Sequence, residues 1–223
     1  MSLTIGFYLF PEMTQLDFAG PFEVFSQVPD TQIHLAAKTL EPVKADTGLR
    51  LLPTTTLEAC PDVDVLCVPG GPHVDLLFDD ETTLAFLRRQ GVQASYVTSV
   101  CTGSLILGAA GLLKGYKATS HWTSVDLLSH FGAVPTRGRV VKDRNRITGG
   151  GVTAGIDFAL TVVAELKGDR VAKMIQLGTE YNPEPPFNCG HPDVAEPEIV
   201  DAVKTRMSDR LERRRGRAGA FAE

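Results

Sequence analysis

The sequence predicts an α/β protein, a three-layer αβα sandwich with a mostly parallel central sheet. Short apolar runs alternate along the chain with segments of helical periodicity. Two of these runs, 63–68 and 95–100, are apolar on both faces, which is typical of parallel strands buried between two layers of helices. A chain of 223 residues with 43% hydrophobic residues is also long enough to bury one large core.

The first half of the chain alternates strands with helices. The opening apolar run stops at Pro11, which cannot continue a central strand. Apolar residues then recur at helical spacing, with Asp17 near the start of that helix, and Asp79 or Asp80 is expected to cap the next helix. The strands expected here span 3–10, 33–37 and 63–68, with short extended pieces within 43–53, and the helices span 16–27 and 79–90.

In the second half of the chain strands again alternate with helices, and a proline-rich segment follows near the C-terminus. Five prolines between Pro183 and Pro197 predict a loop. We therefore expect a single domain over residues 1–223, with a proline-rich loop at 184–197 and a C-terminal helix and frayed tail at 198–223. The strands expected here span 95–100, 117–119, 140–141 and 146–148, and the helices span 105–113, 124–131, 153–166, a segment from 170 and 198–213.

Composition excludes several classes of protein. No apolar stretch reaches the roughly 18–20 residues of a membrane span, and the N-terminus does not resemble a signal peptide. The four cysteines form no C-x-x-C pair and the five histidines are scattered, so neither a disulfide framework nor a metal site is predicted. We expect a cytoplasmic protein with no cofactor and no membrane partner.

The charge of the chain, −5 overall, is unevenly distributed. Residues 204–217 carry seven basic side chains against two acidic ones, a net charge of +5, so the rest of the chain carries −10. A basic tail is compatible with nucleic-acid binding, but the acidic body argues against such a partner. We interpret the tail as a solvated helix whose end frays at 216–219.

The strongest chemical signal is the position of Cys101. It follows the buried strand 95–100 directly and is followed at once by the start of a helix, the strand–turn–helix pattern of a nucleophile elbow. Such a turn places the sulfur at the carboxyl edge of the sheet, where open α/β proteins bind ligands. The positive end of the next helix is expected to lower the pKa of the thiol. The other three cysteines are interpreted as structural or as unpartnered loop residues.

Glycine-rich turns end two neighbouring strands. Gly70 and Gly71 follow the strand 63–68, where their backbone N–H groups could turn toward a ligand. The run Gly149 to Ala154 fits G-x-G-x-x-A, but a helix rather than a second strand follows, so a dinucleotide site is not predicted. These glycines are expected to let the backbone pack near Cys101.

Two polar residues remain ambiguous from the sequence alone. Asp17 is either a helix-start carboxylate that interacts with the helix dipole or a functional acid. His121 is either a base, a polar wall residue or a satisfied structural histidine.

The chain resembles the ThiJ/PfpI superfamily, which has a class I glutamine-amidotransferase-like fold. The resemblance covers roughly residues 4–180 and implies a flavodoxin-like sheet with a nucleophile elbow. Within the superfamily, L-D-F-A-G-P, C-T-G-S and the stretch 181–188 resemble the isonitrile (isocyanide) hydratases. The motifs that carry the wider resemblance are P-G-G at 69–71, T-S-V-C-T-G-S at 98–104, A-A-G-L-L-K-G at 109–115, A-T-S-H-W at 118–122 and G-G-G-V-T-A-G-I-D at 149–157.

The resemblance implies a hydro-lyase that converts an isonitrile and water into an N-substituted formamide. Cys101 would attack the terminal carbon to give a thioimidate, and Asp17 would act as general acid and base. The backbone N–H groups of Gly71, Thr102 and Val152 would line the site, with His121 as a further substrate-binding residue. The superfamily is typically homodimeric. Thr102 stands where the protease-like branch has histidine, which argues against a Cys-His dyad.

Two alternatives stay open. A glyoxalase- or deglycase-like activity on small carbonyls would use the same thiolate, although such members usually keep a glutamate where this chain has Asp17. A redox-sensing or regulatory module would instead oxidise Cys101 reversibly. The sensor domains of some AraC-type regulators carry similar motifs, but only about forty residues follow Tyr181, and a DNA-binding region needs roughly 100.

Overall fold

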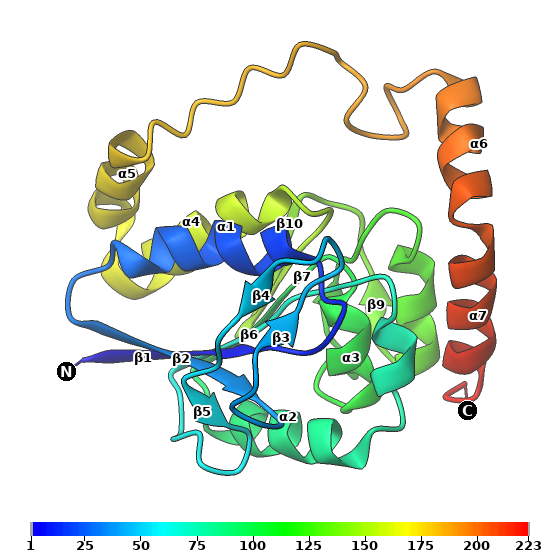
Figure 1. Ribbon diagram of the computed structural model, residues 1–223. Helices are drawn as coiled ribbons and strands as arrows, with labels where there is room; N and C mark the ends of the chain where they lie inside the picture. Colours follow the sequence, from blue (N-terminus) through cyan, green and yellow to red (C-terminus); the bar gives the residue numbers. More distant parts are fainter. Residues whose placement is uncertain (1, 223) are drawn as a thin grey trace.

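The computed structural model describes residues 2–222 and confirms the α/β prediction (Figure 1). A seven-stranded sheet has the order β10-β11-β7-β6-β1-β2-β5. Every neighbouring pair is parallel except β10 and β11, which form an antiparallel hairpin at one edge. The inner order β2-β1-β6-β7-β11 is the flavodoxin-like arrangement. The strands are β1 (Leu3–Tyr8), β2 (Thr31–Ala37), β5 (Thr55–Thr56), β6 (Val65–Val68), β7 (Tyr96–Val100), β10 (Val140–Asp143) and β11 (Arg146–Gly149).

Helices cover both faces of this sheet (Figure 1). On one face α1 (Gln15–Ser26) packs against α4 (Ala154–Lys167), which in turn contacts α5 (Asp169–Gly178). On the other face lie α2 (Glu81–Gln93) and α3 (Gly103–Ala109). Asp80 caps α2 as expected, since its side chain accepts a hydrogen bond from the Thr83 N–H. The central strands β1, β6 and β7 are almost entirely buried, which explains their continuous apolar sequences.

Short elements outside the main sheet differ from the expectations. The strand expected at 117–119 is β8 (Lys117–Ala118), which pairs with β9 (Val134–Pro135) rather than with the main sheet, while β3 (Val43–Lys44) pairs with β4 (Arg50–Leu51). The helix expected at 124–131 is a 3₁₀ helix, η2 (Val125–Phe131), in which the Leu127 N–H bonds to the Ser124 C=O. A second 3₁₀ helix, η1 (Val74–Leu77), was not expected.

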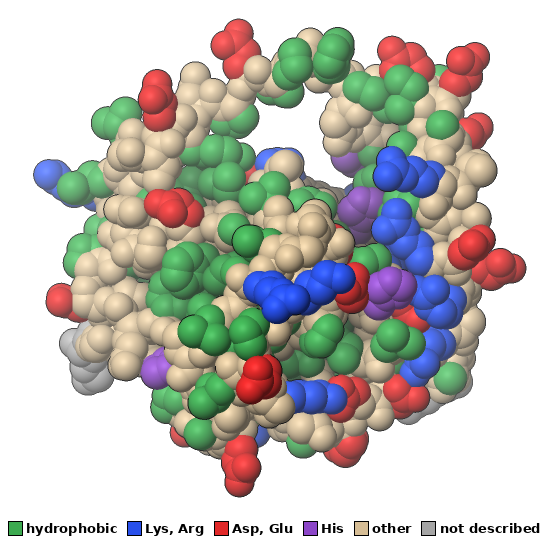
Figure 2. All heavy atoms as spheres, in the orientation of Figure 1, with side chains coloured by type: hydrophobic (Ala, Val, Ile, Leu, Met, Phe, Trp, Pro, Cys, Tyr) green, Lys and Arg blue, Asp and Glu red, His purple; other side chains and the backbone are tan. Residues whose placement is uncertain are grey.

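The C-terminal region corrects the sequence expectation most clearly. Residues 179–196 form no helix or strand and arch away from the body, with an opening beneath them (Figure 2). The single helix expected at 198–213 is two helices, α6 (Pro197–Arg206) and α7 (Ser208–Gly219), so the expected fraying at 216–219 is wrong. Packing orders this end of the chain, because Ala218 is fully buried and the Phe221 ring lies 5.0 Å from the Phe131 ring.

No helix within residues 2–222 is long and apolar enough to cross a membrane.

Candidate active site

Cys101 forms the expected turn between β7 and α3. Its backbone has a φ of 55°, in the left-handed region that non-glycine residues rarely occupy. The surrounding backbone fixes this conformation: the Cys101 N–H donates to the Gly149 C=O at 3.1 Å. The hydroxyls of Ser104 and Ser120 donate to the Cys101 C=O at 3.2 and 3.1 Å. A strained residue held from several sides is typical of a functional position.

Glycines allow the turn after β6 to approach this elbow closely. A Cβ added at Gly103 would lie 2.1 Å from the Val68 carbonyl oxygen. A Cβ at Gly70 would lie 2.6 Å from the Thr102 nitrogen and 2.8 Å from Asp17 Oδ2. All three distances are shorter than real Cβ contacts, so only glycine permits this packing of two backbone segments. Gly149, the last residue of β11, also lies beside the elbow, as expected, because its C=O accepts a hydrogen bond from the Cys101 N–H.

Asp17 reaches the elbow from the first turn of α1. Its side chain is buried, with only 1% of the residue exposed, and Oδ2 accepts a hydrogen bond from the Gly70 N–H at 2.9 Å. Oδ1 has no hydrogen-bond partner among the described residues. Burial raises the pKa of Asp17 to about 8, although hydrogen bonds from Gly70 and from the Cys101 thiol oppose this shift. Asp17 is therefore more than a helix-start carboxylate: it contacts the proposed nucleophile.

The pKa of Cys101 is raised, so the expected lowering by the helix is wrong. Burial is the largest cause, followed by the negative charge of Asp17. Hydrogen bonds from Thr102 and the positive charge of Arg214 lower the pKa of the thiol, but they do not outweigh burial. A helix of seven residues cannot by itself offset the removal of a thiolate from water.

Cys101 and Asp17 consequently titrate as one buried pair. The charge of Asp17 raises the pKa of Cys101, whereas the hydrogen bond from the Cys101 thiol lowers the pKa of Asp17, so the protonation of each group depends on the other. When the pair holds one proton, the proton resides on either the carboxyl or the thiol. The form with a neutral carboxyl and a thiolate combines a proton donor with a nucleophile at one point of the sheet edge.

Gly71 and Thr102, both expected to contact the substrate, are bonded to each other. The Gly71 N–H donates to Thr102 Oγ1 at 3.0 Å, and Thr102 Oγ1 donates to the Gly71 C=O at 3.1 Å. The structure thus brings the β6 turn and the elbow together through a reciprocal pair of hydrogen bonds. The Gly71 N–H is directed at this hydroxyl rather than at an open space.

Val152 and His121 lie on a cleft of about 1100 Å³ beside the elbow. Ser120, whose hydroxyl bonds to the Cys101 carbonyl, also lines this cleft, whereas Cys101 and Asp17 are not among its lining residues. The cleft thus adjoins the elbow through Ser120, and the Cys101 side chain is not part of its lining. The other lining residues come from the segment just before β10, from the segment 179–196 and from helices α6 and α7. They include Arg137, Arg139, His191, Lys204, Leu211 and Arg215.

His121 is a neutral side chain in this position. Its Nδ1 lies 2.8 Å from the Thr123 hydroxyl. Burial, together with the positive charges of Arg214 and Arg210, lowers the pKa of His121 to about 4. Near pH 7 the imidazole is uncharged and is suited to hydrogen bonding rather than to ion pairing.

Arg214 also reaches the site, and it was missed because the sequence places it in a basic tail. Its guanidinium donates to the carbonyls of Gly71 and Pro72. A helical pattern could have identified it: Arg214 takes the central position of a stripe of otherwise apolar residues spaced four and three apart. The stripe consists of Met207, Leu211, Arg214, Ala218 and Phe221.

No group of three or more His, Cys, Asp or Glu side chains within residues 2–222 is arranged to hold a metal ion.

The chain is similar to known proteins over most of its length. The DJ-1/PfpI family model matches residues 4–165. An isonitrile hydratase of Pseudomonas putida is 56% identical over 214 residues, which cover 96% of this chain and 94% of that protein. A crystal structure of a ThiJ/PfpI family protein from Pseudomonas syringae has a TM-score of 0.96 and 47% identity, and the match covers 98% of this chain and 91% of that one.

A more distant match covers only part of a longer protein. An HTH-type transcriptional regulator of Pseudomonas aeruginosa, GbdR, is 30% identical over 180 residues, 77% of this chain but 49% of the regulator. The similarity therefore concerns about half of that protein.

Proposed function

The chain belongs to the DJ-1/PfpI family, and we propose that within it this protein is an isonitrile hydratase, which adds water to R–N≡C to give an N-substituted formamide. The observation that carries the proposal is the 56% identity, over nearly both full lengths, with the isonitrile hydratase of Pseudomonas putida. A buried carboxyl beside a cysteine at the elbow supports it, because the reaction needs a nucleophile and a proton donor at one carbon atom.

In the proposed first step, the Cys101 thiolate attacks the terminal carbon of the isonitrile. A carbon–sulfur bond forms, one carbon–nitrogen bond pair becomes a lone pair on nitrogen, and the lone pair that the terminal carbon already carries takes the proton from Asp17. The product is a thioimidate, R–N=CH–S, bound to Cys101. The raised pKa of Asp17, about 8, keeps its carboxyl protonated at neutral pH for this transfer.

In the second step, water adds to the thioimidate carbon. Asp17, now a carboxylate, accepts a proton from this water, and Oδ1 has no competing partner in the described protein. Asp17 passes this proton to the imine nitrogen, the tetrahedral intermediate expels the thiolate, and its hydroxyl gives a proton back to Asp17 as R–NH–CHO leaves. The second step therefore regenerates Cys101 and Asp17 without a cofactor or a metal.

The other site residues have supporting roles in this proposal. The N–H groups of Thr102 and Val152 offer donors to the intermediates, and Thr102 is held by its hydrogen bonds with Gly71. His121, being neutral, forms part of the polar wall of the cleft through which the substrate enters.

A redox-sensing role has less support than catalysis. Sensor cysteines have low pKa values and are accessible to solvent. Cys101 is 6% exposed and the pKa of its thiol is raised by burial.

Replacement of the nucleophile tests the proposal directly. Wild-type protein is expected to convert simple alkyl and aryl isonitriles to N-formyl products, detected by mass spectrometry, while Cys101→Ala lowers the rate at least about 10³-fold. Cys67→Ala, at a buried cysteine inside β6, is the control and is expected to retain activity. Turnover of methylglyoxal but of no isonitrile in the panel would favour the carbonyl-directed alternative and overturn this proposal.

We also propose that the protein is a cytoplasmic homodimer. Large apolar side chains are exposed around the arch: Met174 and Leu177 on α5 are 63% and 82% exposed, and Phe187 is 77% exposed. Helix α6 buries none of its residues against the rest of the chain. A second copy that covers these surfaces accounts for their composition. The four free cysteines are in keeping with a reducing compartment.

A further inference from the structure

Arg214 is the most deeply buried charged side chain of the C-terminal helices. The residue is 2% exposed, although it belongs to a segment rich in exposed basic side chains (Figure 2). Burial of a guanidinium costs free energy unless hydrogen bonds and opposite charge compensate for the lost water. The environment of this side chain therefore requires an explanation.

The hydrogen bonds of Arg214 supply only part of that compensation. Nη1 donates to Ser124 Oγ at 2.9 Å, and Nη2 donates to the carbonyls of Gly71 and Pro72 at 3.3 and 3.2 Å. All three acceptors are neutral oxygens, and Nε has no partner among the described residues. These contacts orient the guanidinium toward the β6 turn but do not neutralise its charge.

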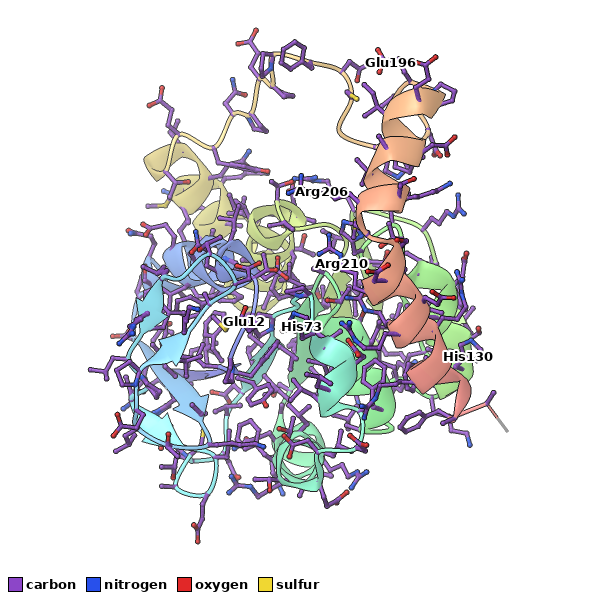
Figure 3. The ribbon with its side chains drawn as sticks, turned by 45° about the vertical axis from the view of Figure 1, so that its right-hand side comes forward. Glu12, His73, His130, Glu196, Arg206 and Arg210 are labelled. Carbon is purple, nitrogen blue, oxygen red and sulfur yellow. The ribbon has the colours of Figure 1, made fainter. Side chains whose placement is uncertain are left out.

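Two other arginines of α7, unlike Arg214, form ion pairs with aspartates of the body. Arg213 Nε lies 2.6 Å from Oδ2 of the buried Asp75, and an Arg217 nitrogen lies 2.6 Å from Asp79 Oδ1. Arg213 also contacts His73, which lies opposite α7 in Figure 3. The helix is thus held to η1 by other arginines, so Arg214 is not needed merely to attach α7.

The anions that interact favourably with Arg214 are Cys101 and, to a smaller extent, Asp75. Since Asp75 is already paired with Arg213, the Cys101 thiolate is the anion without another cationic partner. We propose that Arg214 is a positioning residue of the reaction, which stabilises the Cys101 thiolate by its charge and holds the Gly71–Pro72 turn against the elbow. This inference rests on the proposed function, in which Cys101 is the nucleophile.

The hydrogen bonds form a continuous path from α7 to the thiol. The Gly71 carbonyl accepts from both Arg214 and Thr102, and the Gly71 N–H returns a bond to the Thr102 hydroxyl. Thr102 in turn hydrogen-bonds to Cys101 through its backbone. Displacement of the guanidinium would therefore move the Gly71 carbonyl, the acceptor that orients the Thr102 hydroxyl. It would also remove a positive charge that acts on the Cys101 sulfur.

The surrounding charges are compatible with this role. The Cys101 sulfur is influenced by the carboxyl of Asp17 from α1 and by Arg214 from α7. Arg214 is influenced by Arg210 and Arg213 on its own helix and by Asp75 of η1, and its charge in turn lowers the pKa of His121 beside the cleft. Burial and the two neighbouring arginines lower the pKa of Arg214, but a guanidinium stays protonated in proteins.

Alkylation of Cys101 by iodoacetamide, followed by peptide mass spectrometry as a function of pH, tests the charge without requiring isonitrile turnover. Arg214→Gln removes the charge and keeps an amide donor, whereas Arg214→Lys keeps the charge and loses the planar fork. We expect the midpoint of the rate–pH curve to rise by about one unit in the Gln variant, with alkylation at neutral pH about tenfold slower. The Lys variant is expected to stay within a few tenths of the wild-type midpoint.

A matched control removes a neighbouring contact of the same helix. Arg217→Met breaks the ion pair with Asp79, which is 74% exposed and does not need a partner, and should leave the alkylation midpoint unchanged. If the Gln protein is unfolded by circular dichroism, Arg214→Met replaces it as the uncharged variant. Equal midpoints in the charged and uncharged variants would overturn the inference.

Isonitrile hydration is measured separately on the same proteins. In the Lys variant kcat is expected to fall, because the Gly71–Pro72 turn loses the Nη2 group that donates to both of its carbonyls, while the alkylation midpoint is retained. Wild-type kcat in this variant would contradict the positioning role. Absence of isonitrile turnover in the wild-type protein would reject the proposed function, whereas the alkylation curves would still decide whether Arg214 stabilises the thiolate.

Discussion

At the residue scale, the central feature is that a carboxyl and a thiol share one buried site. Asp17 and Cys101 are 1% and 6% exposed, and the pKa of each is raised chiefly by burial. The sequence pointed to both residues as candidates for the chemistry, but the predicted lowering of the thiol pKa was wrong, because the pKa of Cys101 is raised. Burial and a facing carboxyl depend on residues far apart in the chain, and neither is visible in the residues around Cys101.

The pair predicts a particular pH dependence of the reaction. Since the active form has lost one of two protons, kcat/KM is expected to rise with pH as the first proton of the pair is released; Asp17, with a pKa of about 8, has the lower pKa of the two groups. Asp17→Asn should lower kcat at least about 100-fold, because the amide cannot transfer the proton. Isonitrile turnover measured from pH 5 to 10 gives both results. A flat profile over this range would contradict the shared-proton mechanism.

Asp17 also makes stability depend on pH. Its folded-state pKa of about 8 exceeds its ordinary value of 3.8, so the folded protein binds a proton that the unfolded chain has released. This contribution to stability is present below about pH 4 and is lost as pH rises toward 8, with a slope of up to about 1.4 kcal/mol per pH unit.

Denaturant unfolding of wild type and Asp17→Asn at several pH values measures this slope. The difference in unfolding free energy between the two proteins should move in favour of the Asn variant as pH rises from 4 to 8. A difference that stays constant over this interval would show that the carboxyl ionises in the folded protein at its ordinary pKa.

At the element scale, two turns create the site. The turn after β6 and the elbow after β7 meet at the carboxyl edge of the sheet, and the approach depends on missing side chains at Gly70 and Gly103. The order of strands and helices could be predicted from apolar periodicity. The 3₁₀ form of η2 and the division of the last helix at Met207 could not, because these depend on packing rather than on local pattern.

Gly70 gives a test at this scale. Gly70→Ala places a methyl group 2.6 Å from the Thr102 nitrogen, so the elbow must shift. We expect kcat/KM to fall about 100-fold, since small displacements of catalytic groups have such effects, and stability to fall by about 1–3 kcal/mol. Gly178→Ala, at a position with no atom within 4 Å of the added Cβ, is the control for glycine replacement. Equal activity in the two variants would show that the close approach has no catalytic importance.

At the scale of the whole molecule, the C-terminal quarter of the chain is arranged around the sheet rather than inside it. The arch at 179–196 leaves the body at α5 and returns through α6 and α7, whose inner sides line the cleft (Figures 1 and 3). Tyr181 anchors the start of the arch through a 2.9 Å hydrogen bond to Asp157. The basic tail therefore contributes to the surroundings of the site, which the sequence alone did not indicate.

The exposed apolar surface around the arch predicts self-association. Light scattering coupled to size exclusion should give twice the chain mass of 24.1 kDa for the wild type. Leu177→Glu places a charge on the proposed interface and is expected to shift the protein toward the monomer mass. Val92→Glu, at a similarly exposed apolar residue on α2, should leave the dimer intact. A monomeric wild type at micromolar concentration would rule out the proposed homodimer.

The sequence by itself determined the α/β class, the elbow at Cys101, the glycine turns and the family. These follow from local features: apolar runs with a fixed period, turn residues at defined positions and short motifs. Tertiary structure alone decided the protonation of the Asp17–Cys101 pair, the reciprocal bonds of Gly71 and Thr102, and the burial of Arg214. Those features arise where α1, β6, β7 and α7 converge. Electrostatic and packing energies depend on distances between such segments, and no local pattern encodes those distances.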